Sequence, residues 1–333
     1  MKNKFKVALI GCGVISDNHL IPLISNPSVE LVGLCDINRE RAEQKLIKHG
    51  LSIPVYTDYI EMLDSLELDS VHIATPHYLH CEMTLEALKR NVNVFLEKPM
   101  CISEDEIEKM LAAERQSLAK VCVCFQNRLN PSTIFAKQIC EKDGGAISAY
   151  GSLFWNRDDA YYAQDAWRGK IKTEGGGVMI NQAIHTIDLL HIIMGKPISV
   201  TATKSNHTLK GIIDVEDSCE GLILFEGGGQ ANFYATNSYR GLDNNYVYIV
   251  TKNHKIEIRR DHIYLDDVRI DDENGEIPLM GKAVYGIGHR ELINRFYEAI
   301  ENRSEMPVSL ESAQWAVRII LAAYKSNDTP IKI

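Results

Sequence analysis

The chain has little of what several classes of protein require. No stretch approaches the ~20 uninterrupted apolar residues of a membrane span, and the first apolar run, 7–15, holds two glycines and predicts a strand and turn rather than a signal peptide. Positive charge is also scarce: 36 Lys and Arg face 45 Asp and Glu, and the formal net charge of -9 argues against a nucleic-acid-binding surface. We therefore expect neither a membrane nor a nucleic acid as a partner.

The eight cysteines form no recognisable metal or disulfide pattern. Most lie singly inside apolar segments, and the closest pair, Cys122 and Cys124, has an i,i+2 spacing in a predicted strand. That spacing is poor for a metal or a redox centre. We expect no bound metal and free thiols in a reducing cytoplasm.

What is present is an ordinary globular composition of 333 residues, long enough for two domains. Short apolar runs and helical patterns alternate over the first ~125 residues. The predicted strands are Lys6–Ile10, Glu30–Cys35, Val71–Ala74, Asn93–Leu96 and Val121–Phe125. The predicted helices include Asn38–His49, Asp58–Ser65, Tyr78–Arg90 and Ser103–Ser117. Fully apolar strands between helices predict an α/β Rossmann fold, a doubly wound parallel sheet covered on both faces.

The pattern changes after residue 126, so we place the domains at 1–126 and 127–333. A predicted helix and an extended run lead to a glycine-preceded helix, and strands without intervening helices follow; these strands are Ile198–Asn206, Cys219–Phe225, Gln230–Thr236, Tyr246–Thr251 and Lys255–Arg259. This order predicts an α+β domain on a largely antiparallel, open sheet. Two helices close the chain, and the last, about 309–325, is a candidate to pack back on the first domain.

A glycine turn after the first strand predicts a dinucleotide site. In KVALIGCGVISDNHL, Gly11 makes the tight turn and Gly13 lets backbone N–H groups approach a pyrophosphate at the helix N-terminus. Ser16 replaces the third glycine of the fingerprint, so the motif alone also fits a glycine turn of another α/β fold. Asp36 ends the next strand, where it would accept hydrogen bonds from a ribose diol and repel a 2′-phosphate. NAD is therefore favoured, with NADP as an alternative if Arg39 and Arg41 compensate.

The segment VFLEKPM places Lys98 at the carboxyl end of the fifth predicted strand, the edge at which parallel sheets bind ligands. Pro99 restrains the backbone that follows. By itself a lysine in this position is more often a surface residue.

Several pieces of sequence occur in a specific order. They are GCGVIS at 11–16, CDINRERA at 35–42, ATPHYLH at 74–80, EKP at 97–99, WRG at 167–169, GGGVMINQAIHTIDLL at 175–190 and YGIGHRELINRFYEAI at 285–300. Together they resemble the glucose–fructose oxidoreductase / inositol dehydrogenase / rhizopine-catabolism family, often written Gfo/Idh/MocA, over nearly the whole chain. The resemblance implies that Lys98 is catalytic.

The helix after the three glycines carries a polar pair on one face. Asn181 and His185 are i,i+4. Without context, a buried histidine satisfied by a local acceptor is the simpler interpretation. The resemblance implies a catalytic pair, because the family has Asp or Asn followed four residues later by His. Gly175–Gly177 are expected to let the backbone pass close to cofactor or substrate.

The mechanism that the resemblance implies is hydride transfer between a secondary alcohol carbon and the nicotinamide C4. His185 would act as general base, since an imidazole with an ordinary pKa of ~6.5 suits neutral pH. Lys98 would stabilise charge on the same oxygen, and Asn181 would orient that oxygen or the lysine. The inositol dehydrogenase branch has Asp at this position, so Asn181 makes an inositol substrate less certain.

Other positions are carried over from the family as expectations, against the simpler interpretation of packing or surface polarity. The residues assigned to the cofactor, in addition to Gly11, Gly13 and Asp36, are Val14, Ile15, Arg41, Thr75, Pro76, His80, Glu97, Lys98, Asn127, Trp167, Arg168 and Tyr285. The residues assigned to the substrate are Arg157, Tyr162, Asn181 and His185, with Tyr161 beside them.

We thus expect an NAD-dependent enzyme acting on a hydroxyl of a sugar, nucleotide-linked sugar or cyclitol, and a homodimer or homotetramer. One alternative is a glycosidase of the family that uses tightly held NAD transiently. The other is a non-catalytic dinucleotide-sensing regulator, which the presence of both Lys98 and His185 argues against.

Overall fold

The computed structural model describes residues 4–241, 244–259, 262–270 and 287–333. It divides into two compact units. Unit 1 comprises the chain up to Cys101, together with Asp105–Cys124 and His289–Ser312; unit 2 comprises Ile102–Glu104, Phe125–Gly288 and Ala313–Ile333. Residues 289–312, which we assigned to the second domain from the sequence, therefore lie in unit 1.

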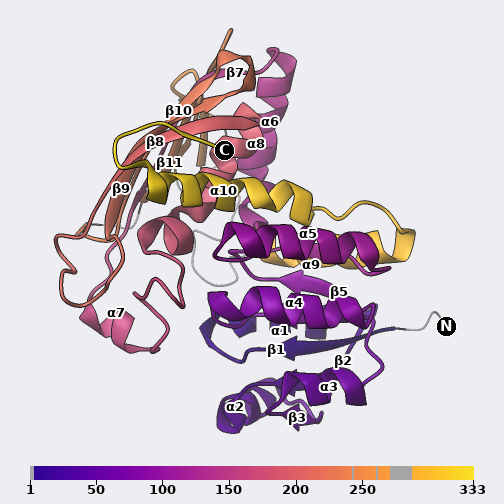
Figure 1. Cartoon of the computed structure of the whole chain (residues 1–333). Coiled ribbons are helices and arrows are strands. Elements are labelled where there is room, and N and C mark those ends of the chain that lie inside the picture. The colour runs from indigo at the N-terminus through magenta and orange to yellow at the C-terminus, as the bar shows by residue number, and fades with distance from the viewer. Residues whose placement is uncertain (1–3, 242–243, 260–261, 271–286) are drawn as a thin grey trace. The chain divides into compact units, whose positions relative to one another are not determined.

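Unit 1 is built on a six-stranded parallel sheet with the strand order β3-β2-β1-β4-β5-β6 (Figure 1). The strands are β1 (Phe5–Ile10), β2 (Val29–Cys35), β3 (Val55–Tyr56), β4 (Ser70–Ile73), β5 (Asn93–Leu96) and β6 (Val121–Val123). The helices are α1 (Asp17–Ser25), α2 (Arg39–His49), α3 (Tyr59–Ser65), α4 (His80–Lys89), α5 (Glu104–Gln116) and α9 (Gly288–Asn302). This strand order is that of a dinucleotide-binding Rossmann fold, and it confirms the predicted class.

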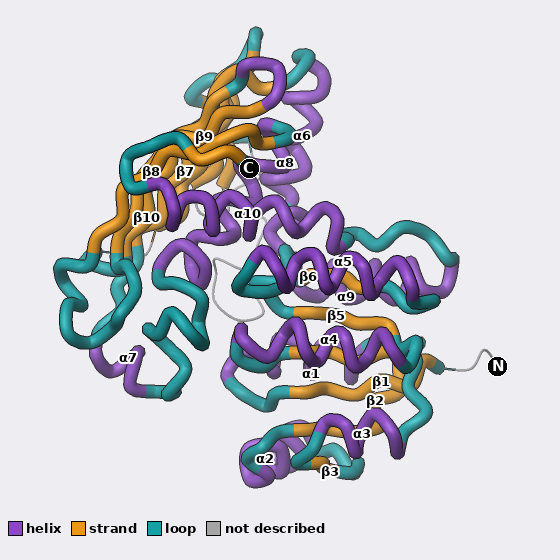
Figure 2. Tube along the Cα trace, viewed as in Figure 1, coloured by secondary structure: helices purple, strands orange, loops and turns teal. Residues whose placement is uncertain are grey.

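The apolar strands of unit 1 are buried because helices cover the sheet. Figure 2 shows α4 running beside β5. On α9, Phe296 and Tyr297 are buried, and the Tyr297 hydroxyl lies 2.9 Å from the His72 ring on β4. This contact explains why a segment from the C-terminal part of the sequence belongs to the first unit.

Unit 2 contains a sheet whose described strands have the order β14-β13-β12-β11-β7-β10-β9-β8-β15. They are β7 (Ala146–Phe154), β8 (Pro197–Ser205), β9 (Ser218–Phe225), β10 (Gln230–Thr236), β11 (Asn244–Thr251), β12 (Lys255–Arg259), β13 (His262–Leu265), β14 (Val268–Arg269) and β15 (Ile331–Lys332). The helices are α6 (Pro131–Lys142), α7 (Asp159–Ala163), α8 (Ile184–Met194) and α10 (Leu310–Ser326), and a π-helical turn, Met179–Ala183, precedes α8. Only β7 and β10 pair in parallel among these described neighbours, so the largely antiparallel prediction is confirmed.

One face of this sheet packs against α8. A Cβ on Gly151 of β7 would lie 2.6 Å from Thr186 of α8, so glycine allows the close approach. Because side chains alternate along a strand, the neighbouring residues point to the other face. We call that surface the open face; it carries the half-buried side chains of Tyr150, Phe154, Leu222, Tyr234 and Tyr246.

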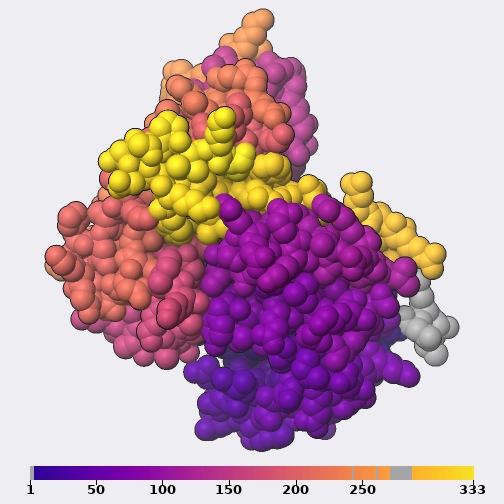
Figure 3. All heavy atoms as spheres, in the orientation of Figure 1, coloured from indigo at the N-terminus to yellow at the C-terminus, as the bar shows by residue number. Residues whose placement is uncertain are grey.

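The C-terminal residues complete unit 2. Strand β15 pairs with β8, and the Ala202 N–H donates to the Ser326 hydroxyl at 2.8 Å. Figure 3 shows the C-terminal residues, in yellow, beside the pink and orange atoms of unit 2. The short strands β3, β13, β14 and β15 and the short helix α7 were not predicted.

Candidate functional site

The glycine turn of unit 1 has the geometry of a phosphate cradle. Gly11 has a φ of +94°, and a Cβ there would lie 2.4 Å from the Ala74 carbonyl oxygen, so only glycine fits. A Cβ on Gly13 would meet nothing within 4 Å, so the backbone borders open space just before α1. Ser16 is fully buried, and its hydroxyl donates to the Gly13 carbonyl at 2.6 Å. The serine thus packs where the fingerprint usually has glycine.

Asp36 links this turn to the end of β2. One carboxylate oxygen accepts the Cys12 N–H at 2.8 Å, and the other accepts the Asn38 N–H at 2.8 Å. The carboxylate is therefore fixed beside the cradle, the position that a ribose diol requires. Arg41 is exposed on the first turn of α2.

The residues present fit NAD. Val14 is 81% exposed beside the open space at Gly13, and Ile15 is half-buried. In unit 2, Asn127 is buried, and its Oδ1 has no hydrogen-bond partner among the described residues. A buried acceptor of this kind suits a ligand hydroxyl.

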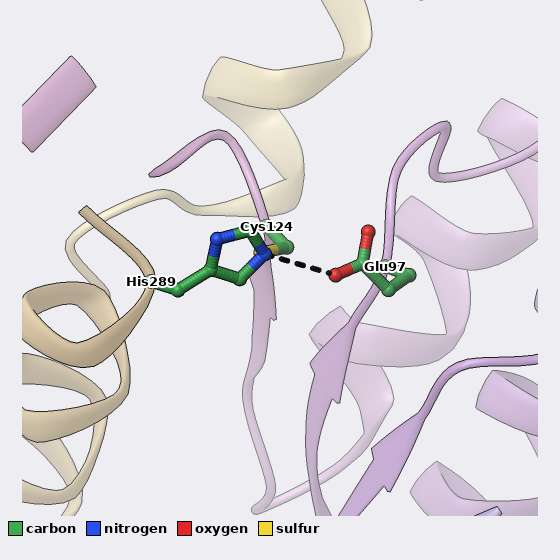
Figure 4. A group of neighbouring side chains, drawn as sticks. All are labelled: Glu97, Cys124 and His289. Carbon is green, nitrogen blue, oxygen red and sulfur yellow. Dashed lines mark ion pairs between the residues drawn. The ribbon is translucent and has the colours of Figure 1, made fainter. Parts of the chain in front are cut away.

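Glu97 anchors the backbone beside Lys98. Its Oε2 accepts the Lys98 N–H at 3.2 Å, while its Oε1 lies 3.0 Å from His19 Nε2 and 3.5 Å from His289 Nε2. Figure 4 shows His289 and Glu97 facing each other, with Cys124 behind the imidazole. His19 and His289 were not among the predicted site residues; no sequence spacing links either of them to residue 97.

The cluster of Glu97, Cys124 and His289 is the described grouping whose atoms could bind a metal, because they lie within 4.8 Å of one another. The three groups influence one another's protonation. The two histidines hold the pKa of Glu97 well below its usual value, so the carboxylate is ionised and already partnered. Burial and the Glu97 carboxylate raise the pKa of the Cys124 thiol well above its usual value, so it is protonated.

A chain of buried hydrogen bonds extends from Glu97 across the sheet. His19 Nδ1 lies 2.9 Å from His72 Nδ1, and His72 Nε2 lies 2.9 Å from the Tyr297 hydroxyl. Burial lowers the pKa of His72 well below its usual value, so the ring is neutral, with one nitrogen donating and the other accepting. The chain ties α1, β4 and α9 to the loop that carries Lys98.

His80 joins the two loops at this edge of the sheet. Its Nδ1 lies 2.7 Å from the Pro99 carbonyl, and its Nε2 lies 2.8 Å from the Thr75 carbonyl. The ring is fully buried, and burial lowers its pKa. Because both partners are carbonyl acceptors and a neutral ring has one N–H, His80 donates to one carbonyl at a time, between the loops that contain Thr75, Pro76 and the cis Lys98–Pro99 bond.

In unit 2, Asn181 and His185 flank the junction between the π-helical turn and α8. Both are buried, 8% and 7% exposed. The Asn181 Nδ2 donates to Glu174 Oε1, and the other oxygen of Glu174 accepts the Gly169 N–H. The His185 ring meets the Phe125 ring edge-on at 5.9 Å. π-helical turns are frequent at functional sites.

The three glycines before this turn are required for close packing within unit 2. A Cβ on Gly176 would lie 2.1 Å from the Tyr324 hydroxyl oxygen, and one on Gly177 would lie 1.8 Å from the Glu216 carbonyl oxygen. A Cβ on Gly175 would lie 2.5 Å from the Ile102 side chain. The expectation that the backbone here passes close to cofactor or substrate stays a prediction, because these contacts describe only the Cβ side of each glycine.

Two buried carboxylates that sequence analysis missed hold the start of this segment. Glu174 is 1% exposed, and burial raises its pKa to about 7. Glu216 accepts the Gly177 N–H at 2.9 Å and the Met179 N–H at 3.0 Å. For Glu174 a signal did exist, because a charged residue directly precedes three glycines and an apolar run.

The loop before the glycines forms a stack of aromatic rings and guanidinium groups. The Arg157 guanidinium lies 4.5 Å from the Trp155 ring and 4.8 Å from the Tyr161 ring. The Arg168 guanidinium lies 4.6 Å from the rings of both Tyr161 and Trp167. Cation–π contacts of this kind hold both arginines in place.

Tyr162 packs beside this stack, with its ring edge-on to the Tyr161 ring at 5.1 Å between the centroids. Tyr162 is buried, and its hydroxyl accepts from Asn237 Nδ2 at 3.1 Å. Asp188 of α8, which was not a predicted site residue, forms a two-bond ion pair with Arg128, with 2.6 Å between Asp188 Oδ1 and Arg128 Nη2, so it serves structure. Tyr285 lies outside the described residues.

Comparisons with known proteins agree with these features. Residues 5–125 match the family model for the GFO/IDH/MocA oxidoreductase family with an NAD-binding Rossmann fold, and residues 138–257 match the model of the GFO/IDH/MocA C-terminal domain. The uncharacterized oxidoreductase YrbE of Bacillus subtilis (strain 168) is 24% identical, with 98% of this chain and 95% of that protein covered. Levoglucosan dehydrogenase of Pseudarthrobacter phenanthrenivorans is 25% identical, covering 72% and 69%.

Among solved structures, the WlbA dehydrogenase of Bordetella pertussis, in complex with NADH and UDP-GlcNAcA, has a TM-score of 0.86 at 23% identity, covering 99% of both chains. At this identity the likeness shows the fold alone.

The parallel sheet and its glycine cradle define a protein of the NAD-binding Rossmann class. With matches to both domain models, the chain belongs to the GFO/IDH/MocA oxidoreductase family, and NAD is its cofactor. No described helix is long and apolar enough to cross a membrane.

Proposed function

We propose that this protein is a dehydrogenase or reductase acting on a secondary hydroxyl of a sugar, nucleotide-linked sugar or cyclitol. When bound, NAD supplies the carbon that accepts or returns the hydride. The observation that carries the proposal is a buried histidine and amide on one segment of unit 2, combined with a lysine that a fixed carboxylate anchors in unit 1. Of the proteins named above, levoglucosan dehydrogenase is named for a compound of this class, and the WlbA dehydrogenase structure contains a nucleotide-linked sugar.

The proposed roles follow from the chemistry of each group. In the oxidative direction, His185 removes the hydroxyl proton as general base. The Lys98 ammonium stabilises the negative charge that develops on that oxygen, and Asn181 orients the oxygen by hydrogen bonding. Both arginines of the aromatic stack and Tyr162 are proposed to border the substrate. His80 and Glu97 are proposed to support the cofactor side by positioning its loops.

We also propose a cytoplasmic homodimer or homotetramer. All eight cysteines are free and buried, as suits a reducing compartment. The open face offers aromatic side chains that are half-buried in the single chain, the composition that self-association favours.

A substrate panel tests the activity. The protein is mixed with NAD, or with NADP, and with polyols, free sugars and UDP-sugars, and absorbance is followed at the nicotinamide band. Turnover of one class supports the proposal. No turnover across the panel with both cofactors would instead favour a regulator, and sugar release without net NADH would favour a glycosidase.

Lys98→Ala is expected to lower kcat by orders of magnitude, about 100-fold or more, because it removes charge stabilisation at the reacting oxygen. NAD affinity, measured by calorimetric titration, is expected to change little. Lys89→Ala, a change of the same kind on the exposed surface of α4, is the matched control. Loss of NAD binding without a specific loss of kcat would contradict the catalytic role.

A further inference from the structure

Glu174 is a buried carboxyl group that the proposed mechanism does not use. It directly precedes the three glycines and is 1% exposed. Its two oxygens take hydrogen bonds from two N–H donors, the Gly169 backbone and the Asn181 side chain. A buried carboxyl placed between two donors is a strong acceptor when ionised.

The donors differ in their freedom to move. The Gly169 N–H is part of the backbone, in a turn where glycine has a φ of +69° and a Cβ would lie 2.4 Å from Ile213. The Asn181 amide can rotate by half a turn and exchange its nitrogen and oxygen. An ionised Glu174 requires the amide nitrogen to face it, which directs the Asn181 carbonyl oxygen away from Glu174.

Protonation of Glu174 reverses this preference. A carboxylic acid has one O–H donor, and a donor cannot share a hydrogen bond with an N–H group. The Gly169 N–H is fixed, so the Asn181 amide is the group that can move. Its rotation separates the Asn181 N–H from the Glu174 O–H and offers the amide oxygen to that O–H instead. Asn181 would thereby present its NH₂ group, instead of its carbonyl oxygen, on the side away from Glu174.

We propose that Glu174 is a positioning residue for Asn181, and that the charge on Glu174 sets which end of the Asn181 amide faces the reaction. This inference rests on the proposed function for its catalytic consequence. The amide contact itself does not depend on it.

The groups around Glu174 bring its protonation close to neutral pH. Burial is the main cause that raises the pKa of Glu174 to about 7, and the Glu216 carboxylate adds to it. The Gly169 and Asn181 hydrogen bonds and the Arg168 guanidinium oppose the rise. Tyr162 of α7 also faces Glu174, with a pKa that burial raises, and so stays neutral.

Infrared difference spectroscopy across neutral pH tests the switch without a substrate. In the wild-type protein, acidification is expected to produce a carboxylic acid C=O band together with a shift of a side-chain amide band. Asn181→Ala should keep the acid band and lose the amide shift, whereas Glu174→Gln should lose both. Glu220→Gln, at an exposed position on β9, is the control and should lose neither.

If no acid band appears near neutral pH in the wild type, or if the amide shift persists in Asn181→Ala, the proposal is wrong. Should Glu174→Gln fail to fold, the wild-type and Asn181→Ala spectra alone decide.

Kinetics with a substrate from the panel tests the consequence. Glu174→Gln is expected to lower kcat about tenfold with little change in KM, and to have no further effect in the Asn181→Ala background, because it acts through that amide. Equal losses in both backgrounds would overturn the positioning role. If neither the wild type nor any variant turns over a substrate, while the expected infrared changes are observed, the proposed function is contradicted and the amide contact is not.

Discussion

At the scale of single residues, buried carboxylates do most to arrange the proposed site. Glu97, Glu174 and Glu216 are each nearly inaccessible to solvent, and each accepts backbone N–H groups next to a proposed catalytic element. A buried charge is costly unless it is hydrogen-bonded, so these positions tolerate little change. The sequence marks Glu97 by its motif and Glu174 by its place before three glycines, whereas only its partners distinguish Glu216 from a surface acid.

Glu97→Gln is expected to cost about 3 kcal/mol of unfolding free energy at neutral pH, because it removes the buried partner of two histidines. The pKa of Glu97 is lowered on folding, so its stabilising contribution is present above the ordinary value of 4.5 and is lost as the pH falls toward the folded value. The difference between wild type and variant should therefore shrink on acidification.

Urea unfolding at several pH values measures this difference. Glu86→Gln, which alters a more exposed contact with Lys89 and Arg90, is the control and should change stability little. An equal effect of the two substitutions at neutral pH would contradict the role assigned to Glu97.

At the scale of elements, some local signals proved sufficient. The helix predicted over 38–49 has such signals at both ends: the Asn38 side chain accepts the N–H groups of Glu40 and Arg41, and Gly50 follows the helix with a left-handed φ of 64°. These features depend on a few neighbouring residues, so the sequence encodes them directly. The π-helical turn was missed because its pattern of apolar residues resembles that of an α-helix.

The two glycines of the cofactor turn are expected to respond differently to alanine. Gly11→Ala forces a positive φ and a clash with the Ala74 carbonyl, and should cost about 2 kcal/mol of stability or more. Gly13 has a φ of -72° and open space beside it, so Gly13→Ala should leave stability unchanged. Its methyl group would nevertheless occupy the cradle, and NAD affinity should fall at least about tenfold.

Thermal unfolding and calorimetric NAD titration together separate the two effects. Unchanged NAD affinity in Gly13→Ala would contradict the proposal that the pyrophosphate binds beside Gly13.

At the scale of the whole molecule, the two units supply different chemistry. Unit 1 carries the cradle, Asp36 and Lys98, and unit 2 carries Asn181, His185 and the aromatic stack. The chain order does not follow this division, because residues 289–312 return to the first unit. Packing of the buried face of α9 on β4 requires that return.

Association through the open face makes a further prediction at this scale. Tyr234→Arg should shift the sedimenting species toward monomer, because it places a charge among aromatic side chains that would be buried between copies. Ile47→Arg, at an exposed position on α2, is the control and should leave the assembly unchanged. A wild-type chain that sediments as a monomer at micromolar concentration would contradict the oligomer.

The sequence by itself determined the two-part organisation, the parallel and antiparallel sheets and the family. These depend on features that neighbouring residues carry: apolar periodicity, a glycine turn and short motifs in a specific order. Lys98, Asn181 and His185 were selected from the same motifs, and their catalytic roles stay predictions.

Tertiary structure alone decided which residues surround them. His19, His72, Glu97 and His289 come from four separate stretches of chain, and only the pairing of β4 with β5 and the packing of α1 and α9 bring them together. The same holds for the glycines at 175–177, whose neighbours are Ile102, Glu216 and Tyr324. No local pattern specifies such contacts, because their partners are far apart in sequence and meet only when the core is packed.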